Sequence, residues 1–135
     1  VGPHTPPPFY EVPALVRVFC DDLGERLRHV RPEEADVRSL ADLLAWADGR
    51  FQWIHPFKDF NGRIGRVVLV ALFRKLGLPP LETLPVPPGT RQGYLDALRT
   101  SDLGDPARLL ELWTRRIAEA TRRLPLEGTH GGPER

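Results

Sequence analysis

The chain has 135 residues, of which 41% are hydrophobic and 27% are charged, so its composition is that of a globular domain with one core rather than of a disordered chain. Nineteen lysines and arginines offset eighteen aspartates and glutamates to leave a net charge of +1, which argues against a broad nucleic-acid-binding surface. The longest uncharged apolar run, residues 67–73, is too short to cross a membrane, and we expect neither nucleic acid nor a membrane as a partner.

The N-terminal segment is rich in proline and lacks the features of a secretory signal. Residues 1–8 contain four prolines, which exclude a helix, and residues 1–12 are predicted to form an extended arm. The arm has neither a basic start nor a long apolar stretch, which favours a cytoplasmic protein. From Pro13 to about Arg28, hydrophobic residues recur at helical spacing. Cys20, the single cysteine, is expected to be a small buried residue of this helix.

Two further helices are predicted on either side of a polar loop. The first, residues 37–54, carries an apolar stripe and ends near His55, because Pro56 disfavours helical geometry in the residue before it. The second, residues 63–76, is followed by Gly77 as a C-cap. Because the middle of this second helix is apolar on every side, we expect it to be the buried centre of the domain.

The remainder of the chain predicts a proline-rich loop and two closing helices. Thr90 is expected to cap the first of these, with Tyr94 facing inward, and Asp105 the second, with Pro106 at its first position. Residues 125–135 are predicted to be a disordered tail. No segment shows sustained alternation of polar and apolar residues, so the sequence predicts an all-α fold. The inward stripe of the last helix is predicted to comprise Leu110, Trp113, Ile117, Ala120 and Leu124.

The segment "IHPFKDFNGRIGR", residues 54–66, places polar groups at the start of the third predicted helix. The first turn of a helix has unpaired backbone N–H groups and a partial positive charge, and therefore attracts anions. Asn61 is expected to cap this helix or to bind a ligand, and Gly62 lets the backbone approach a bound group. Arg63 and Arg66 lie on one face of the first turn, and two guanidinium groups suit a polyphosphate better than a single carboxylate.

Other residues of this segment complete the expected site. A carboxylate at Asp59 would repel a polyphosphate unless a cation lay between them, and Mg²⁺ commonly joins one or two carboxylates to phosphate oxygens. Histidine changes its charge near neutral pH, so His55 is expected to be a general base that deprotonates an attacking hydroxyl. Phe57 is expected to be the buried anchor of the loop, and Gly65 to leave room for a ligand beside the helix.

Each of these residues also has an ordinary structural interpretation. A histidine before a proline is usually structural, and an Asn-Gly pair is most often a turn or a helix cap. Asp59 could pair with Lys58 at the surface with little gain in stability, and Arg63 and Arg66 could be surface residues. We favour the functional interpretation because these features would otherwise have to coincide within twelve positions.

The segment "HPFKDFNGRIGR" resembles the signature of the Fic (Fic/Doc) domain family, His-Pro-Phe-x-Asp/Glu-Gly-Asn-Gly-Arg-x-x-Arg. The resemblance extends over about residues 3–120, because the proline-rich segment and the two closing helices are also similar to those of the family. It implies a compact, all-helical Fic-like catalytic domain over residues 13–124, with residues 1–12 as a remnant of the family's β-hairpin flap. The positions that agree with the signature are His55, Pro56, Phe57, Asp59, Asn61, Gly62, Arg63 and Arg66.

Most Fic enzymes transfer AMP from ATP to a protein hydroxyl. The resemblance therefore implies a protein adenylyltransferase (an AMPylator) that uses ATP with Mg²⁺ and modifies a Ser, Thr or Tyr side chain of a target protein. The roles that the resemblance implies are catalytic base for His55, Mg²⁺ ligand for Asp59, anion hole for Asn61 and Gly62, and β/γ-phosphate binding for Arg63 and Arg66.

Three features depart from the family pattern. Phe60 replaces the first glycine of Gly-Asn-Gly, and a bulky residue is strained there if the position needs a positive φ. Only residues 1–8 could belong to the flap. The Ser/Thr-x-x-x-Glu-Gly/Asn motif of the family's autoinhibitory helix is not found in the chain. Any such inhibition is therefore expected from an antitoxin-like protein supplied in trans, as in toxin–antitoxin pairs.

Three alternatives stay open. The same fold could transfer another group, such as UMP, phosphocholine or phosphate. A degenerate domain could instead bind a nucleotide or a partner without catalysis, an alternative that Phe60 supports. A DNA-binding helix pair is the weakest alternative, because the predicted helix 63–76 is too apolar to lie in a groove of DNA.

Overall fold

The computed structural model describes residues 5–84 and 86–122 of the chain. In these residues the fold consists of α-helices and two short 3₁₀ helices, with no strand, which confirms the predicted all-α class. The predicted tail and Leu124 lie outside the described residues. The elements are η1 (Phe9–Glu11), α1 (Val12–Arg28), α2 (Val37–Ile54), α3 (Asn61–Lys75), η2 (Leu81–Thr83), α4 (Thr90–Asp102) and α5 (Ala107–Arg122).

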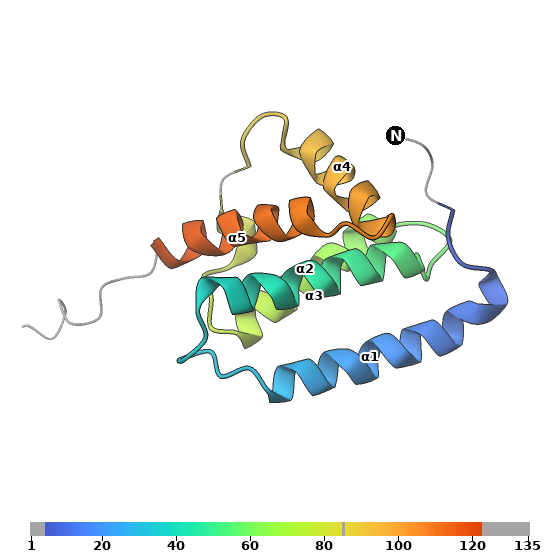
Figure 1. Cartoon of the computed structure of the whole chain (residues 1–135), viewed down its shortest axis with the longest axis horizontal. Coiled ribbons are helices and arrows are strands. Elements are labelled where there is room, and N and C mark those ends of the chain that lie inside the picture. Colours follow the sequence, from blue (N-terminus) through green and yellow to red (C-terminus); the bar gives the residue numbers. More distant parts are fainter. Residues whose placement is uncertain (1–4, 85, 123–135) are drawn as a thin grey trace, which may run out of the picture.

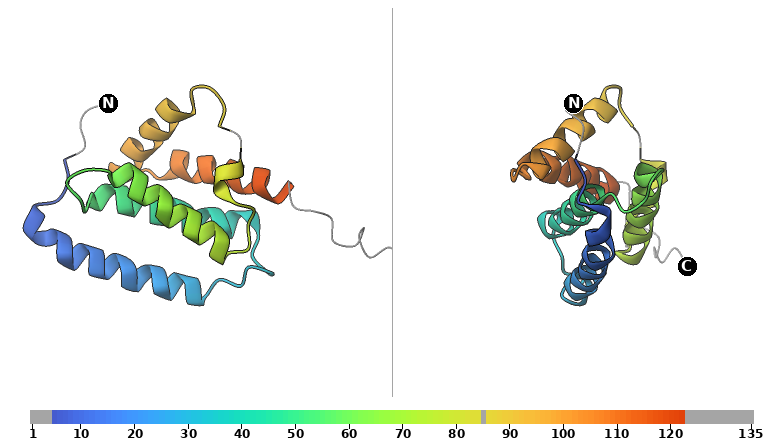
Figure 2. Two further views of the ribbon diagram at one scale, coloured as in Figure 1. Left: turned by 180° about the vertical axis from the view of Figure 1, so that it is seen from behind. Right: turned by 90° about the vertical axis from the view of Figure 1, so that its right-hand side faces the viewer.

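Helix α2 is the centre of the domain. It packs against α1, α3, α4 and α5, and Figure 1 shows it between α1 on one side and α5 on the other. The two further views of Figure 2 place α4 beyond α5, on the side away from α1. The core-facing residues of α2 include Leu44, Ala47 and Ile54, each at most 1% exposed. The apolar stripe predicted for residues 37–54 is therefore buried, and the helix that carries it is the central one.

The expectation that residues 63–76 form the buried central helix is wrong. Helix α3 buries one face, which includes Gly65, Leu69 and Phe73, whereas Val67 on another face is 66% exposed. The reason is that α3 packs mainly against α2 and η2, so one side of the helix has no helical neighbour among the described residues. Apolar composition around a helix does not specify how many neighbours the fold supplies.

The expected burial of Cys20 is also wrong, because its side chain is exposed on α1. The main α-helical neighbour of α1 is α2, so the other faces of α1 are left exposed. The residue before the cysteine, Phe19, occupies the core position instead and is 7% exposed. It stacks on Trp46 of α2, with ring centroids 5.4 Å apart.

Two helix ends have the expected caps, and the start of α4 does not. Gly77 ends α3 with φ +74°, as expected for a C-capping glycine. The carboxylate of Asp105 accepts the backbone N–H of Ala107 at 3.1 Å, as expected for the start of α5. Thr90 does not cap α4, because Gly89 occupies the cap position with φ +80° and the Thr90 hydroxyl donates to the Pro87 carbonyl. Among the described helices, none has both the length and the apolarity that a bilayer span requires.

Candidate active site

The loop between α2 and α3 is bounded by two residues with left-handed backbone geometry. His55 has φ 53° and Phe60 has φ 69°, and no other non-glycine residue of the described chain has a positive φ. His55 ends α2, and its backbone N–H donates to the carbonyl of Phe51 at 3.1 Å. Left-handed geometry costs a bulky L-residue roughly 1–2 kcal/mol. The fold therefore holds both ends of this loop in conformations that the local sequence disfavours.

The side chain of Asn61 fixes the loop internally. It is buried, with 4% exposure, and its Oδ1 accepts the backbone N–H of Phe57 at 2.9 Å while its Nδ2 donates to the Phe57 carbonyl at 2.7 Å. Asn61 is the first residue of α3 and not its cap. Both polar ends of the amide thus bind the backbone of Phe57 and shape the loop, and the amide keeps one further N–H and one further oxygen lone pair.

Two sequence expectations about this segment are corrected by the packing. The side chain of Phe57 is 49% exposed, so the loop is anchored through the Phe57 backbone and not through a buried ring. Gly65 faces α2 and not a ligand, because a Cβ there would lie 2.2 Å from Nε2 of Gln52 and 3.2 Å from the Phe51 ring. Around Gly62, in contrast, a Cβ would meet nothing within 4 Å, so the start of α3 is open to a bound group.

A cleft of about 660 Å³ opens above the start of α3. Five of the described residues that line it are lysine or arginine and one is acidic, although the whole chain carries a net charge of only +1. Positive side chains are therefore concentrated at this cleft, which favours an anionic ligand. The sequence-predicted residues that line it together are His55, Asp59, Asn61, Gly62, Arg63 and Arg66.

The opposite wall of the cleft comes from elements that the motif does not include. Tyr94 of α4 and Trp113 and Arg116 of α5 line it, together with Leu81 of η2. The sequence predicts inward faces for Tyr94 and Trp113 but not that they meet the loop. This wall gives the cleft an apolar end beside its basic end, a combination typical of small-molecule sites.

A buried aspartate joins this wall to the central helix. Asp48 of α2 is 2% exposed and accepts the Tyr94 hydroxyl at 2.7 Å and the indole N–H of Trp113 at 2.9 Å. Burial raises the pKa of the Asp48 carboxyl to about 6, and the two hydrogen bonds oppose that rise. The sequence interpretation missed Asp48, although an acid between Leu44 and Phe51 on the apolar stripe was the signal that could have found it.

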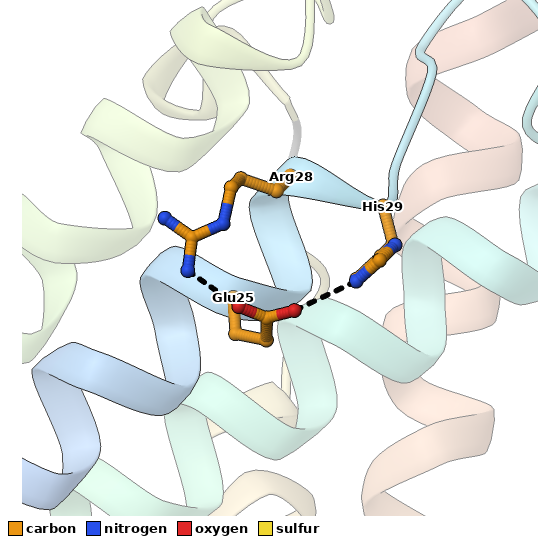
Figure 3. Close-up of polar contacts among 3 residues, drawn as sticks. All are labelled: Glu25, Arg28 and His29. Carbon is orange, nitrogen blue, oxygen red and sulfur yellow. Dashed lines mark hydrogen bonds and ion pairs between the residues drawn. The ribbon is translucent and has the colours of Figure 1, made fainter.

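The described chain offers one other histidine, and it lies outside the cleft. His29, at the end of α1, hydrogen-bonds through Nε2 to Glu25 at 2.8 Å, and the same carboxylate accepts a bond from Arg28 (Figure 3). These bonds hold the pKa of the Glu25 carboxyl below its usual range. The three side chains form an exposed ion-pair network at the C-terminal end of α1, and such surface pairs contribute little to stability.

Among the described residues that line the cleft, Asp59 is the one carboxylate that could bind a metal ion. No group of three or more His, Cys, Asp or Glu side chains in the described chain could hold a metal by itself. Asp59 is exposed and lines the cleft, and Mg²⁺ commonly binds one or two carboxylates together with waters and phosphate oxygens. The residues present therefore fit Mg²⁺ that arrives with a phosphate ligand.

The sequence model of the Fic/DOC family matches residues 1–73, which include the whole loop and most of α3. The chain belongs to the Fic/DOC family. It is 35% identical over 101 residues to a probable protein adenylyltransferase of Aquifex aeolicus, an alignment that covers 74% of this chain and 27% of that protein. It is also 28% identical over 121 residues to protein adenylyltransferase Fic of Drosophila persimilis, covering 90% of this chain and 21% of that protein. The chain thus spans about a quarter or less of the length of these relatives.

Within this Fic/DOC domain, Phe60 occupies the position of the first glycine of the family signature. Its φ of 69° shows that the position does need left-handed geometry, so the strain expected from the sequence is present. The ring is 62% exposed and lines the cleft. The guanidinium carbon of Arg63 lies 5.0 Å from the ring centroid, a cation–π contact of roughly 0.5–1 kcal/mol at an exposed site.

Proposed function

We propose that this Fic/DOC domain transfers AMP from ATP to a Ser, Thr or Tyr hydroxyl of a target protein. The observation that carries the proposal is the convergence of His55, Asp59 and Arg66 on one basic cleft at the start of α3. A base, a carboxylate and a guanidinium around an exposed helix N-terminus are the groups that phosphoryl transfer to a hydroxyl requires.

The proposed reaction assigns a role to each residue at the basic end. His55 takes the proton of the target hydroxyl as its oxygen attacks the α-phosphorus of ATP, and the bond to the β-phosphate breaks to release pyrophosphate. Asp59 would hold Mg²⁺, which supplies positive charge to the phosphate oxygens when bound. Gly62 offers backbone N–H groups at the start of α3, and Arg63 and Arg66 bind the β- and γ-phosphates.

The apolar end of the cleft suits the nucleobase. Tyr94 provides accessible aromatic surface there, and Leu81 and Trp113, which are 1% and 4% exposed, form the floor behind it. Asp48 holds Tyr94 and Trp113 in place by hydrogen bonds. A purine ring can stack on or pack against such groups without a hydrogen-bond code. ATP would then lie along the cleft, with its base beside Tyr94 of α4 and its phosphates at the start of α3.

Further parts of the proposal rest on the sequence. The catalytic unit would extend over residues 13–124, the protein would act in the cytoplasm, and an antitoxin-like protein would inhibit it in trans. The catalytic domain could also transfer UMP, phosphocholine or phosphate. A specific observation favours a second candidate, a nucleotide-binding domain without catalysis, because Phe60 projects a bulky ring at the cleft from a strained backbone.

The test is transfer of label from α-³²P-ATP to protein in a cell lysate with Mg²⁺, compared between the wild-type chain and His55→Ala. His29→Ala is the matched control, because His29 is exposed and does not line the cleft. Adenylyl transfer predicts a labelled band that His55→Ala abolishes and His29→Ala retains. ATP binding without label from any α-labelled nucleotide would support the non-catalytic candidate, and label from γ-³²P-ATP alone would indicate phosphate transfer.

A further inference from the structure

Arg116 brings a positive charge to the cleft from α5, outside the family signature. It lies one helical turn after Trp113, and both residues line the cleft together with Arg66 of α3. Its side chain is half-buried. Arg116 is therefore part of the cleft wall and not a solvated surface residue.

Arg116 and Arg66 line the same cleft, and the charge of Arg66 acts on the Arg116 guanidinium. Burial holds the pKa of the Arg116 guanidinium below its ordinary value, the positive charge of Arg66 lowers it further, and Glu119 opposes both effects. Arginine nonetheless keeps its charge in proteins. Two like charges that line one cleft repel, and a bound anion with several oxygens can bond to both.

Two neighbouring arginines have other surroundings. Arg115 is exposed, forms an ion pair with Glu111 and does not line the cleft. Arg63 lines the cleft, but its guanidinium lies over the Phe60 ring. Of the two signature arginines, Arg66 is thus the one whose charge acts directly on Arg116.

We propose that Arg116 is a further phosphate-binding residue, which acts with Arg66 to hold the terminal phosphates of a polyphosphate ligand. The inference rests on the proposed function for the identity of that ligand as ATP. It adds a specificity element, because a second guanidinium at the far end distinguishes a triphosphate from a monophosphate by the number of charged oxygens that it can bond.

The experiment measures equilibrium binding of ATP, AMP and inorganic tripolyphosphate, with Mg²⁺, to the wild-type chain, Arg116→Gln and Arg66→Gln. Removing one charge-assisted phosphate contact is expected to weaken ATP and tripolyphosphate binding by about tenfold or more and to leave AMP binding nearly unchanged. Arg115→Gln is the matched control and should bind all three like the wild-type chain. Arg116→Lys keeps the charge and should restore part of the affinity, which separates loss of charge from a failure to fold.

The outcomes distinguish this inference from the proposed function. Wild-type affinity for ATP and tripolyphosphate in a folded Arg116→Gln variant, while Arg66→Gln loses both, would overturn the role of Arg116 and leave the proposed function intact. Loss of tripolyphosphate binding in Arg116→Gln, in a wild-type chain that transfers no AMP, would support Arg116 and contradict the proposed function. A wild-type chain that binds neither ATP nor tripolyphosphate would overturn both the role of Arg116 and the proposed function.

Discussion

The buried carboxyl of Asp48 should make the stability of the domain fall as the pH rises through the acid range. Its pKa in the folded state is about 6 instead of 3.8, so between these values the folded chain binds a proton more tightly than the unfolded chain does. The stabilisation from this proton is fully present below pH 3.8 and is lost as the pH rises to about 6. A shift of this size corresponds to about 3 kcal/mol, at 1.36 kcal/mol per pKa unit.

Asp48→Asn isolates this contribution from that of the other carboxyls. The asparagine oxygen can accept one of the two bonds from Tyr94 and Trp113, but its NH₂ group cannot accept the other, so the variant should be less stable at pH 4. Its deficit relative to the wild-type chain should shrink by about 2–3 kcal/mol between pH 4 and pH 7, because only the wild-type chain loses stability through this group. Carboxyls with lowered pKa, such as Asp36 and Asp96, act in the opposite direction but equally in both proteins.

The assay is urea unfolding at several pH values from 4 to 7.5, followed by tryptophan fluorescence. The free energy of unfolding of each protein is compared at each pH, and the quantity of interest is the difference between wild-type and Asp48→Asn chains. A difference that stays constant, or that grows as the pH rises, would refute the inference that a buried proton on Asp48 stabilises the fold.

Substitutions at Gly65 and Phe60 test the packing around the loop, with Gly24 of α1 as a comparison. Gly65→Ala should destabilise the domain by about 1 kcal/mol in thermal unfolding, because its Cβ would displace Gln52 Nε2 from the Asn61 carbonyl and crowd the Phe51 ring at 3.2 Å. Gly24→Ala, whose Cβ meets nothing within 4 Å, should stabilise it by up to about 1 kcal/mol. Equal effects of the two changes would contradict the packing argument. Phe60→Gly should relieve about 1–2 kcal/mol of left-handed strain. It also removes the cation–π contact with Arg63, which contributes roughly 0.5–1 kcal/mol. The free energy of unfolding should therefore rise by no more than about 1 kcal/mol. If the ring narrows the phosphate site, the same variant should raise AMP transfer or ATP affinity, and an unchanged rate and affinity would show that it does not.

The sequence determined the helices and the polar loop of this protein because these depend on neighbours in the chain. Apolar spacing places α2 over residues 37–54 as observed, and Pro56 ends it at His55 by a local steric effect. The end of α3 follows from Gly77, whereas its start lies at Asn61, two residues before the predicted one. The spacing of the signature likewise brings its histidine, carboxylate and arginines to one helix end, since a loop of a few residues leaves little freedom.

Only the tertiary structure decided which helix is central and what completes the site. Periodicity identifies an apolar face but not the number of helices that pack around it, so α3, although apolar, lies at the edge of the domain with Val67 exposed. Asp48 lies 46 and 65 positions from Tyr94 and Trp113 in the chain, and no local pattern pairs residues so far apart. The second wall of the cleft, including Arg116, exists because those long-range hydrogen bonds and the packing of α5 on α2 bring it to the loop.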